Sequence, residues 1–167
     1  GTTSEGIFRI DAAGTFTTLY QEEHLYPSSL VVGSDGALYG TDNYGIRGVA
    51  RTVFRIDGTG NLTSLHSFTN ADGYIPYALV LGSDGALYGT TFEGGSSHLG
   101  TVFRIDTTGT FSSLHSFEYV YGPSVPILGS DCALYGTAGG GPAGGGVVYP
   151  PYGPGHLCLR IAFDLLP

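Results

Sequence analysis

Apolar residues in this chain fall into short runs that end at glycine and aspartate. In its middle part, one such run stops at Asp84-Gly85, a dipeptide typical of hairpin turns, and another begins directly after it. Farther along, Phe111 and Phe117 lie an even number of residues apart and therefore share one face of an extended strand. No segment shows the spacing of a helix. The pattern predicts antiparallel strands at residues 78–81, 86–90, 101–105 and 110–117.

This four-strand pattern is repeated along the chain. The tetrapeptide Phe-Arg-Ile-Asp begins at residues 8, 54 and 103, and therefore recurs after 46 and 49 residues. The segment Gly-Ser-Asp-Gly-Ala-Leu-Tyr-Gly-Thr begins at residues 33, 82 and 129, with Cys132 replacing its second glycine in the last copy. A period of about 48 residues is the size of one β-propeller blade. We therefore predict an all-β propeller of four-stranded antiparallel blades. A β-sandwich would not explain the strict repetition, and a β-solenoid usually has shorter coils.

The repeats divide the chain into blades that its two ends leave incomplete. We expect a half blade at 1–20, blades at 27–68 and 76–117, a half blade at 123–149, and an aberrant tail at 150–167. Three blades' worth of strands is too few to close a ring of four to eight blades. The expected assembly is a six-bladed homodimer. In it, N-terminal strands pair with C-terminal strands of the partner, or with those of the same chain.

The tail departs from the repeat after Tyr149, where Pro-Pro-Tyr-Gly-Pro replaces the expected turn. A shift of one base would give residues 155–160 a Thr-Phe-Ala-Ser string similar to residues 110–113, which suggests a frameshifted or truncated array. The alternative is a natural strand ending. In either case we expect 147–149 and 157–163 to be able to pair as strands.

The net charge of −8, with arginine as the only fixed cation, argues against nucleic-acid binding. No apolar stretch is long enough for a membrane helix, and no signal peptide is recognised in this sequence. Cys132 and Cys158 give no disulfide framework and are expected to be free thiols. The charge leaves a metal cation or a neutral ligand as the expected partner.

The acidic residues separate into two groups. One aspartate group recurs in every repeat turn and is expected to serve turn structure: Asp11, Asp35, Asp57, Asp84, Asp106 and Asp131. The other group falls in the longer loops at the opposite end of the strands: Glu5, Glu22, Glu23, Asp42, Asp72, Glu93 and Glu118. Since Ca²⁺ prefers carboxylate, amide and carbonyl oxygens, Asp42, Asn43, Glu93, Glu5 and Asp72 are candidate calcium ligands. The alternative is that these loops are acidic only because they are solvated.

The histidines also separate by repetition. His66 and His115 occupy equivalent positions among strand-four aromatics and are expected to pack between blades. His24 and His98 lie in non-repeated loops, and each is a candidate general base, as is Glu93. The chain lacks the G-x-S-x-G and H-E-x-x-H motifs, the H-x-H-x-D-H metal cluster and a lysine-containing P-loop.

The three G-S-D-x-A-L-Y-G-T and three F-R-I-D segments resemble the Gly/Leu/Tyr-rich tandem repeats called GloVer repeats, over about residues 1–149. This resemblance implies a propeller in a secreted or cell-surface bacterial protein. In its architecture and its acidic rim alone, the chain resembles the calcium-dependent gluconolactonase-like and paraoxonase-like propellers. That resemblance implies a calcium-dependent hydrolase of small neutral lactones or esters, with acyl-homoserine lactones as one substrate class. The alternative is a non-catalytic surface module that binds glycans or proteins.

Overall fold

The computed structural model describes residues 1–3, 6–23, 25–44, 51–118, 122–129 and 133–139, and the backbone of 160–163. These residues form β-strands joined by turns and loops, and none of them is helical. No helix that could cross a membrane occurs in this part of the chain. The first sheet has the order β1-β2-β3, with β1 (Thr2–Thr3), β2 (Gly6–Ile10) and β3 (Phe16–Gln21).

Two complete four-stranded antiparallel sheets follow, each in chain order. The second sheet contains β4 (Pro27–Val32), β5 (Leu38–Asp42), β6 (Thr52–Ile56) and β7 (Leu62–Ser67). The third contains β8 (Tyr74–Leu81), β9 (Leu87–Glu93), β10 (Thr101–Ile105) and β11 (Phe111–Ser116). Their strand-two and strand-three residues pair in the same register, since Leu38 faces Ile56 as Leu87 faces Ile105. The predicted repeat unit is therefore confirmed as one antiparallel sheet.

The last sheet departs from this pattern. β12 (Ile127–Leu128) and β13 (Ala133–Gly136) pair as antiparallel strands, like the first two strands of the interior sheets. The third strand is β14 (Arg160–Phe163), which pairs with β13 in parallel. Residues 160–163 thus pair as a strand within the segment where the sequence allowed one, whereas 147–149 lie outside the described residues.

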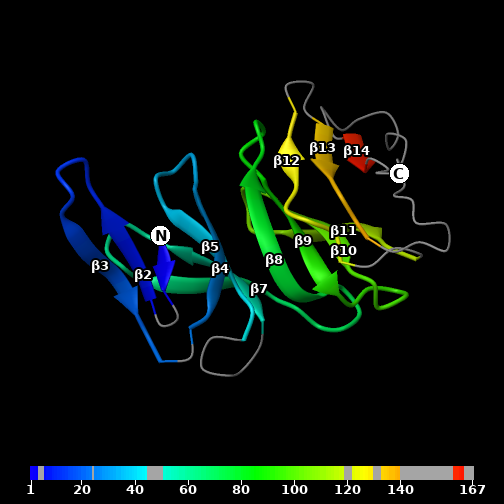
Figure 1. Ribbon diagram of the computed structural model, residues 1–167, viewed down its shortest axis with the longest axis horizontal. Helices are drawn as coiled ribbons and strands as arrows, with labels where there is room; N and C mark the ends of the chain where they lie inside the picture. Colours follow the sequence, from blue (N-terminus) through cyan, green and yellow to red (C-terminus); the bar gives the residue numbers. More distant parts are fainter. Residues whose placement is uncertain are drawn as a thin grey trace.

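The sheets lie side by side in chain order, with the first and last sheets at opposite ends of the array (Figure 1). The leading strands β4 and β8 lie against each other. Hydrogen bonds connect them: the Ser28 hydroxyl donates to the Pro76 carbonyl at 3.2 Å, and the Leu79 amide donates to Ser29 Oγ at 3.0 Å. Twisted four-stranded sheets that meet through their first strands form the architecture of a β-propeller. The predicted fold class is confirmed.

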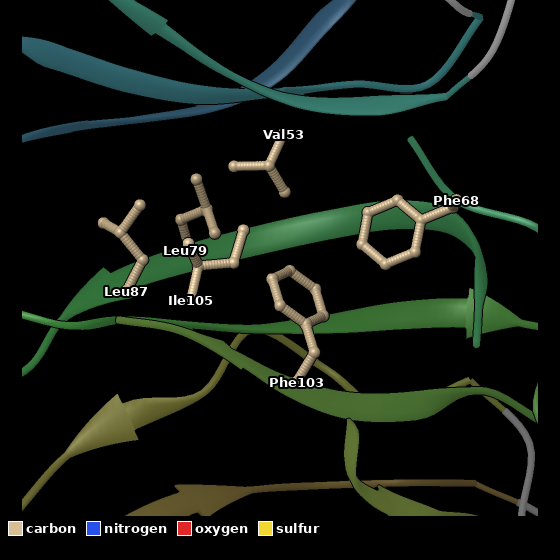
Figure 2. Close-up of a cluster of buried hydrophobic side chains, with 6 residues drawn as sticks. All are labelled: Val53, Phe68, Leu79, Leu87, Phe103 and Ile105. Carbon is tan, nitrogen blue, oxygen red and sulfur yellow. The ribbon is translucent and has the colours of Figure 1, made fainter. Parts of the chain in front are cut away.

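The hydrophobic cores lie between sheets rather than within one sheet. Between the second and third sheets, Val53 and Phe68 pack against Leu79, Leu87, Phe103 and Ile105 (Figure 2). Residues at the same repeat positions form the next core, where Tyr88, Val102 and Phe117 lie against Leu134. Burial of each large apolar side chain contributes about 1.5–3 kcal/mol, so every sheet depends on its neighbours for much of its stability.

One glycine of the repeat is required by a close contact. A Cβ atom on Gly89 would lie 2.3 Å from the Phe103 ring and 2.5 Å from the Ala78 carbonyl oxygen. Gly40 stands in the same relation to Phe54, at 2.4 Å. The glycine of the A-L-Y-G-T segment therefore exists to admit the phenylalanine of the F-R-I-D segment, and the two motifs form one packing unit.

Candidate functional site

The tight turns lie at one end of the sheets, and their aspartates accept hydrogen bonds from the turn itself. Asp57 Oδ1 accepts from the Thr59 hydroxyl at 2.7 Å and from the amides of Thr59 and Asn61 at 2.9 and 3.0 Å. These bonds, led by the one from the Thr59 hydroxyl, lower the pKa of Asp57. Asp106 makes the same contacts with Thr108 and Thr110.

The aspartates of the Ser-Asp-Gly turns also accept amide hydrogens. Oδ1 of Asp35 accepts from the Ala37 amide and Oδ1 of Asp84 from the Ala86 amide, each at 3.1 Å. The prediction that repeated aspartates serve turn structure is therefore confirmed for Asp11, Asp35, Asp57, Asp84 and Asp106, while Asp131 lies outside the described residues.

A second repeated contact connects each Ser-Asp-Gly turn to the strands behind it. Arg104 Nη2 lies 3.0 Å from Asp84 Oδ2, the Tyr88 hydroxyl donates to the same oxygen at 2.9 Å, and Arg104 Nε donates to the Tyr88 hydroxyl at 3.2 Å. The second sheet repeats this arrangement with Asp35, Tyr39 and Arg55. Because all three residue types recur, this triad is part of the scaffold.

A cleft of about 290 Å³ opens between the second and third sheets at this tight-turn end. Leu65, Leu81, Leu87 and Ile105 contribute its apolar lining, and Asp35 and Arg55 contribute polar lining. The Asp35–Arg55 ion pair at 2.8 Å already satisfies these two charges. The cleft lies at the opposite end of the sheets from the non-repeated acidic loops.

At the long-loop end, Asp42 and Asn43 connect the start of β4 to the end of β5. Asp42 is fully buried, and its Oδ1 accepts from the amides of Tyr26 and Tyr44 at 2.9 and 3.2 Å. The Asn43 amide donates to the Tyr26 carbonyl, and Asn43 Oδ1 accepts from the Ser28 hydroxyl at 3.2 Å. The sequence predicted a calcium ligand at Asp42, with a solvated acidic loop as the alternative; in the structure this carboxylate instead accepts hydrogen bonds that hold two loops together.

Asp72 likewise has a structural set of partners. Its Oδ1 accepts from the Thr69 amide and hydroxyl at 2.8 and 3.0 Å, and its Oδ2 lies 3.0 Å from His66 Nε2. The His66 ring stacks on Phe111 with centroids 3.7 Å apart. This contact places His66 between the second and third sheets, as the sequence predicted.

His115 occupies the equivalent position one sheet further on. Its ring contacts Phe117 edge-on at 4.8 Å, and burial lowers the pKa of its imidazole. Both repeated histidines thus contact core aromatics, which agrees with the predicted packing role.

Glu93 and His98, the candidate bases, are both exposed near the β9–β10 connection. Glu93 ends β9, where its carbonyl accepts from the Thr91 hydroxyl at 2.9 Å. His98 has a φ of 59°, and its amide donates to the Gly95 carbonyl at 3.2 Å. Both side chains are accessible at the long-loop end, as the sequence predicted for rim residues.

The candidate calcium ligands do not gather into one site within the described residues. No group of three or more His, Cys, Asp or Glu side chains in this part of the chain could hold a metal ion. Asp42 and Asp72 instead accept hydrogen bonds from their own loops. Glu5 and His24 lie outside the described residues, so their parts in the predicted site remain predictions.

Exposed aromatic side chains adjoin this polar end. The Tyr26 and Tyr44 rings are 42% and 66% exposed and lie 5.0 Å apart. Between the second and third sheets, the guanidinium of Arg51, which precedes β6, lies over the Tyr74 ring of β8 at 3.6 Å from its centroid. The long-loop end therefore combines a buried carboxylate, an amide and a hydroxyl with an accessible tyrosine pair.

The family of the chain follows from its repeats. The model of the Gloeobacter/Verrucomicrobia repeat matches residues 1–163. The chain belongs to this repeat family. The match extends beyond the 1–149 expected from the motifs and takes in β14 of the tail. No curated protein matches the chain significantly.

Solved structures similar to this Gloeobacter/Verrucomicrobia repeat protein include a lyase and a gluconolactonase. Virginiamycin B lyase from Staphylococcus aureus is 25% identical over 78% of this chain and 41% of its own, with a TM-score of 0.60. An inactive variant of that lyase with quinupristin aligns over 90% of this chain and 50% of its own, with 21% identity and a TM-score of 0.64. A gluconolactonase from Xanthomonas campestris is 16% identical over 72% of this chain and 43% of its own, with a TM-score of 0.56. The chain thus spans half or less of each.

Two features of this repeat protein escaped the sequence analysis. The Asp–Tyr–Arg triad had a detectable signal, because its three residue types recur together in the units. The Tyr26–Tyr44 pair had none, because both tyrosines lie in non-repeated segments whose path depends on Asp42. A loop carboxylate followed by a tyrosine is too common to indicate such a contact.

Proposed function

We propose that the chain is part of a propeller hydrolase that opens small neutral lactones or esters at its long-loop end. One observation carries the proposal: Asp42, Asn43 and Ser28 form a connected polar group beside the exposed Tyr26–Tyr44 pair. A few fixed polar groups next to an aromatic surface are the usual composition of a small-molecule site. The fold shared with gluconolactonases supports the same choice.

The residues at this end suggest how a neutral substrate would be bound. The side-chain NH₂ of Asn43 can donate to a substrate carbonyl, the Ser28 oxygen can accept from a substrate hydroxyl, and the tyrosine rings provide an apolar contact. The net charge of −8 disfavours anionic substrates. An acyl-homoserine lactone fits this composition, with its ring at the polar group and its acyl tail on the exposed aromatic rings.

Hydrolysis requires a base that activates water. Glu93 or His98, both exposed at the same end, would take a proton as the water oxygen bonds to the carbonyl carbon. Cleavage of the ring C–O bond then releases an alkoxide, which receives that proton and yields a hydroxy acid. These reaction steps need no external oxidant or reductant.

Calcium is the cofactor implied by the architectural resemblance. The described donors do not form a calcium site, because Asp42, Asp72 and Glu93 belong to no metal-binding cluster. We therefore assign no catalytic step to calcium, and its binding is part of the proposal to be tested. A secreted or surface location in a bacterium also belongs to this proposal.

The alternative function is a non-catalytic module that binds a glycan. The exposed Tyr26–Tyr44 pair favours this alternative, since tyrosine faces next to hydroxyl and amide groups suit a sugar ring. Such a module would bind a saccharide and release no acid from a lactone.

The test is acid release from gluconolactone and acyl-homoserine lactones, measured by pH-stat before and after EDTA and again after calcium is restored. Asp42→Ala removes the oxygen that accepts from the Tyr26 and Tyr44 amides, and should reduce turnover at least tenfold because the two loops lose this connection. Glu93→Gln or His98→Ala, whichever removes the base, should have an effect of the same size. Glu118→Gln, which changes another exposed carboxylate, is the control. Saccharide binding without turnover would establish the alternative, and turnover unaffected by EDTA would exclude the calcium requirement.

A further inference from the structure

The first sheet exposes side chains that the interior sheets bury at the same repeat position. The isoleucine of the F-R-I-D motif is 2% exposed at Ile56 and 1% exposed at Ile105, but 59% exposed at Ile10. Phe16 is 58% exposed, whereas its equivalent Phe111 is half-buried in the core between sheets. Ile10 and Phe16 face each other on neighbouring strands and form the open face of the first sheet.

The last sheet also has an open face, which lies on its first two strands instead of its last two. Tyr135 is 37% exposed, compared with 5% for its equivalent Tyr88, and Ile127 is 64% exposed. In the interior sheets these positions belong to strands one and two, and they pack against the next sheet. Within the part of the chain that the structure describes, the last sheet therefore has no following sheet against its first two strands, and the first sheet has no preceding sheet against its last two strands.

The second sheet also shows what is missing beside it. Leu30 and Leu38 are half-buried, although their equivalents Leu79 and Leu87 are each only 3% exposed. In the third sheet those leucines are covered by strands one and two of the preceding sheet, through Val31 and Tyr39. Among the described residues, the first sheet has no strand one, and of strand two it has only β1.

The strands at the two ends are complementary in register. β1 pairs with Gly6 and Ile7, so within the described residues no strand lies beside Arg9 and Ile10 on that edge of β2. In the third sheet the equivalent residues, Arg104 and Ile105, pair with Tyr88 and Leu87. Their counterparts in β13 are Tyr135 and Leu134, the residues that the edge of β2 lacks.

We propose that a second copy of this chain supplies Tyr135 and Leu134 to the open edge of β2. β12 and β13 of one copy extend the sheet of β2 and β3 in the other, with Leu134 beside Ile10 and Tyr135 beside Arg9. One chain does not close on itself, because its first and last sheets lie at opposite ends of the array (Figure 1). The same contact formed twice closes a symmetric pair. β14 must then leave the edge of β13 that it occupies, and Gly1 must leave Phe8, with which it exchanges hydrogen bonds, to make room for Gly136 of the other copy.

Two further observations favour a second copy over an unrelated partner. The faces to be covered have the composition of the interior interfaces, which this chain already forms with its own sheets. The pairing also gives Arg9 the tyrosine that Arg55 and Arg104 have within their own sheets.

A cross-linking experiment tests the register. Arg9→Cys and Tyr135→Cys are made separately in a full chain in which Cys132 and Cys158 are serine, and the two variants are co-expressed. Residues that face each other on antiparallel strands lie about 4.5–5.5 Å apart at Cα, within the range that a disulfide spans. The mixture should form a disulfide-linked dimer, and either variant alone should not. A mixture without cross-links overturns the proposal.

Mass in solution tests the assembly independently of catalysis. Light scattering of the parent should give twice the 17.4 kDa chain mass. Ile10→Asp should give monomers that keep the parent's circular dichroism, because this residue is exposed in the single chain. Phe92→Asp, which changes an exposed aromatic residue off both open faces, is the control and should remain dimeric. A monomeric parent, open-ended polymers, or a dimeric Ile10→Asp variant would each contradict the closed pair.

Discussion

At the scale of single residues, aspartate has two distinct roles in this protein. Repeated aspartates such as Asp57 and Asp106 accept hydrogen bonds from neighbouring amides and hydroxyls at the tight turns. The non-repeated Asp42 is fully buried and joins two loops at the opposite end. The first role stabilises every unit, whereas the second shapes one candidate site.

The turn aspartates predict how stability depends on pH. Hydrogen bonds, first from the Thr59 and Thr108 hydroxyls, lower the pKa of Asp57 and Asp106 below the value of 3.8 that applies when the chain unfolds. Their stabilisation is therefore complete above that value and is lost as the pH falls through the folded pKa values.

The measurement is the thermal midpoint from neutral pH to about pH 2. Asp57→Asn should lower the midpoint at neutral pH and reduce its further fall in acid. An equal fall of the thermal midpoint in acid for the parent and the variant would show that Asp57 does not contribute to the pH dependence of stability.

At the scale of elements, the repeat unit is a pair of motifs that fit each other. The glycine of strand two leaves room for the phenylalanine ring of strand three and for a backbone carbonyl of strand one, as the contacts of Gly89 with Phe103 and Ala78 show. This contact explains why the two segments have the same amino-acid sequence in successive repeats while the loops between them differ.

Gly89→Ala should therefore destabilise the fold by about 1–3 kcal/mol, because the added methyl group overlaps the Phe103 ring and a backbone carbonyl. Gly58→Ala is the matched control, since a Cβ atom there meets nothing within 4 Å. The measurement is urea unfolding of both variants. Equal midpoints for the two would contradict the packing argument.

At the scale of the whole molecule, stability should be uneven along the array. The strands β9 and β10 are paired on both edges, and their sheet contributes to cores on both of its faces. β3 is an edge strand, and the sheet to which it belongs exposes Ile10 and Phe16. Local opening costs least where few apolar contacts must be broken.

Hydrogen exchange measured by mass spectrometry should therefore find the slowest amides in β9 and β10 and faster ones in β3. In the parent, protection of β2 should rise with protein concentration as a second copy binds. The Ile10→Asp variant should show no such rise. Uniform protection of all sheets would contradict this gradient.

Much of the fold could be predicted from the sequence because its determinants are local and repeated. Asp84-Gly85 favours a hairpin turn from its local sequence alone. A unit of four strands that recurs about every 48 residues is compatible with few architectures. The site could not be predicted to the same degree. Asp42 was predicted to be a calcium ligand in a rim loop, but one of its oxygens accepts hydrogen bonds from the amides of Tyr26 and Tyr44. That outcome depends on two loops meeting in space, which no spacing along the chain records.

The equivalence of the inter-sheet cores also has a genetic consequence. Val53, Phe68 and Leu87 contribute to one core, as Val102, Phe117 and Leu134 do to the next. Unequal crossing-over between such similar coding segments would delete or duplicate one whole unit, and the flanking sheets would still present matching faces. A single recombination event would therefore change the number of units without creating an interface between sheets that does not match.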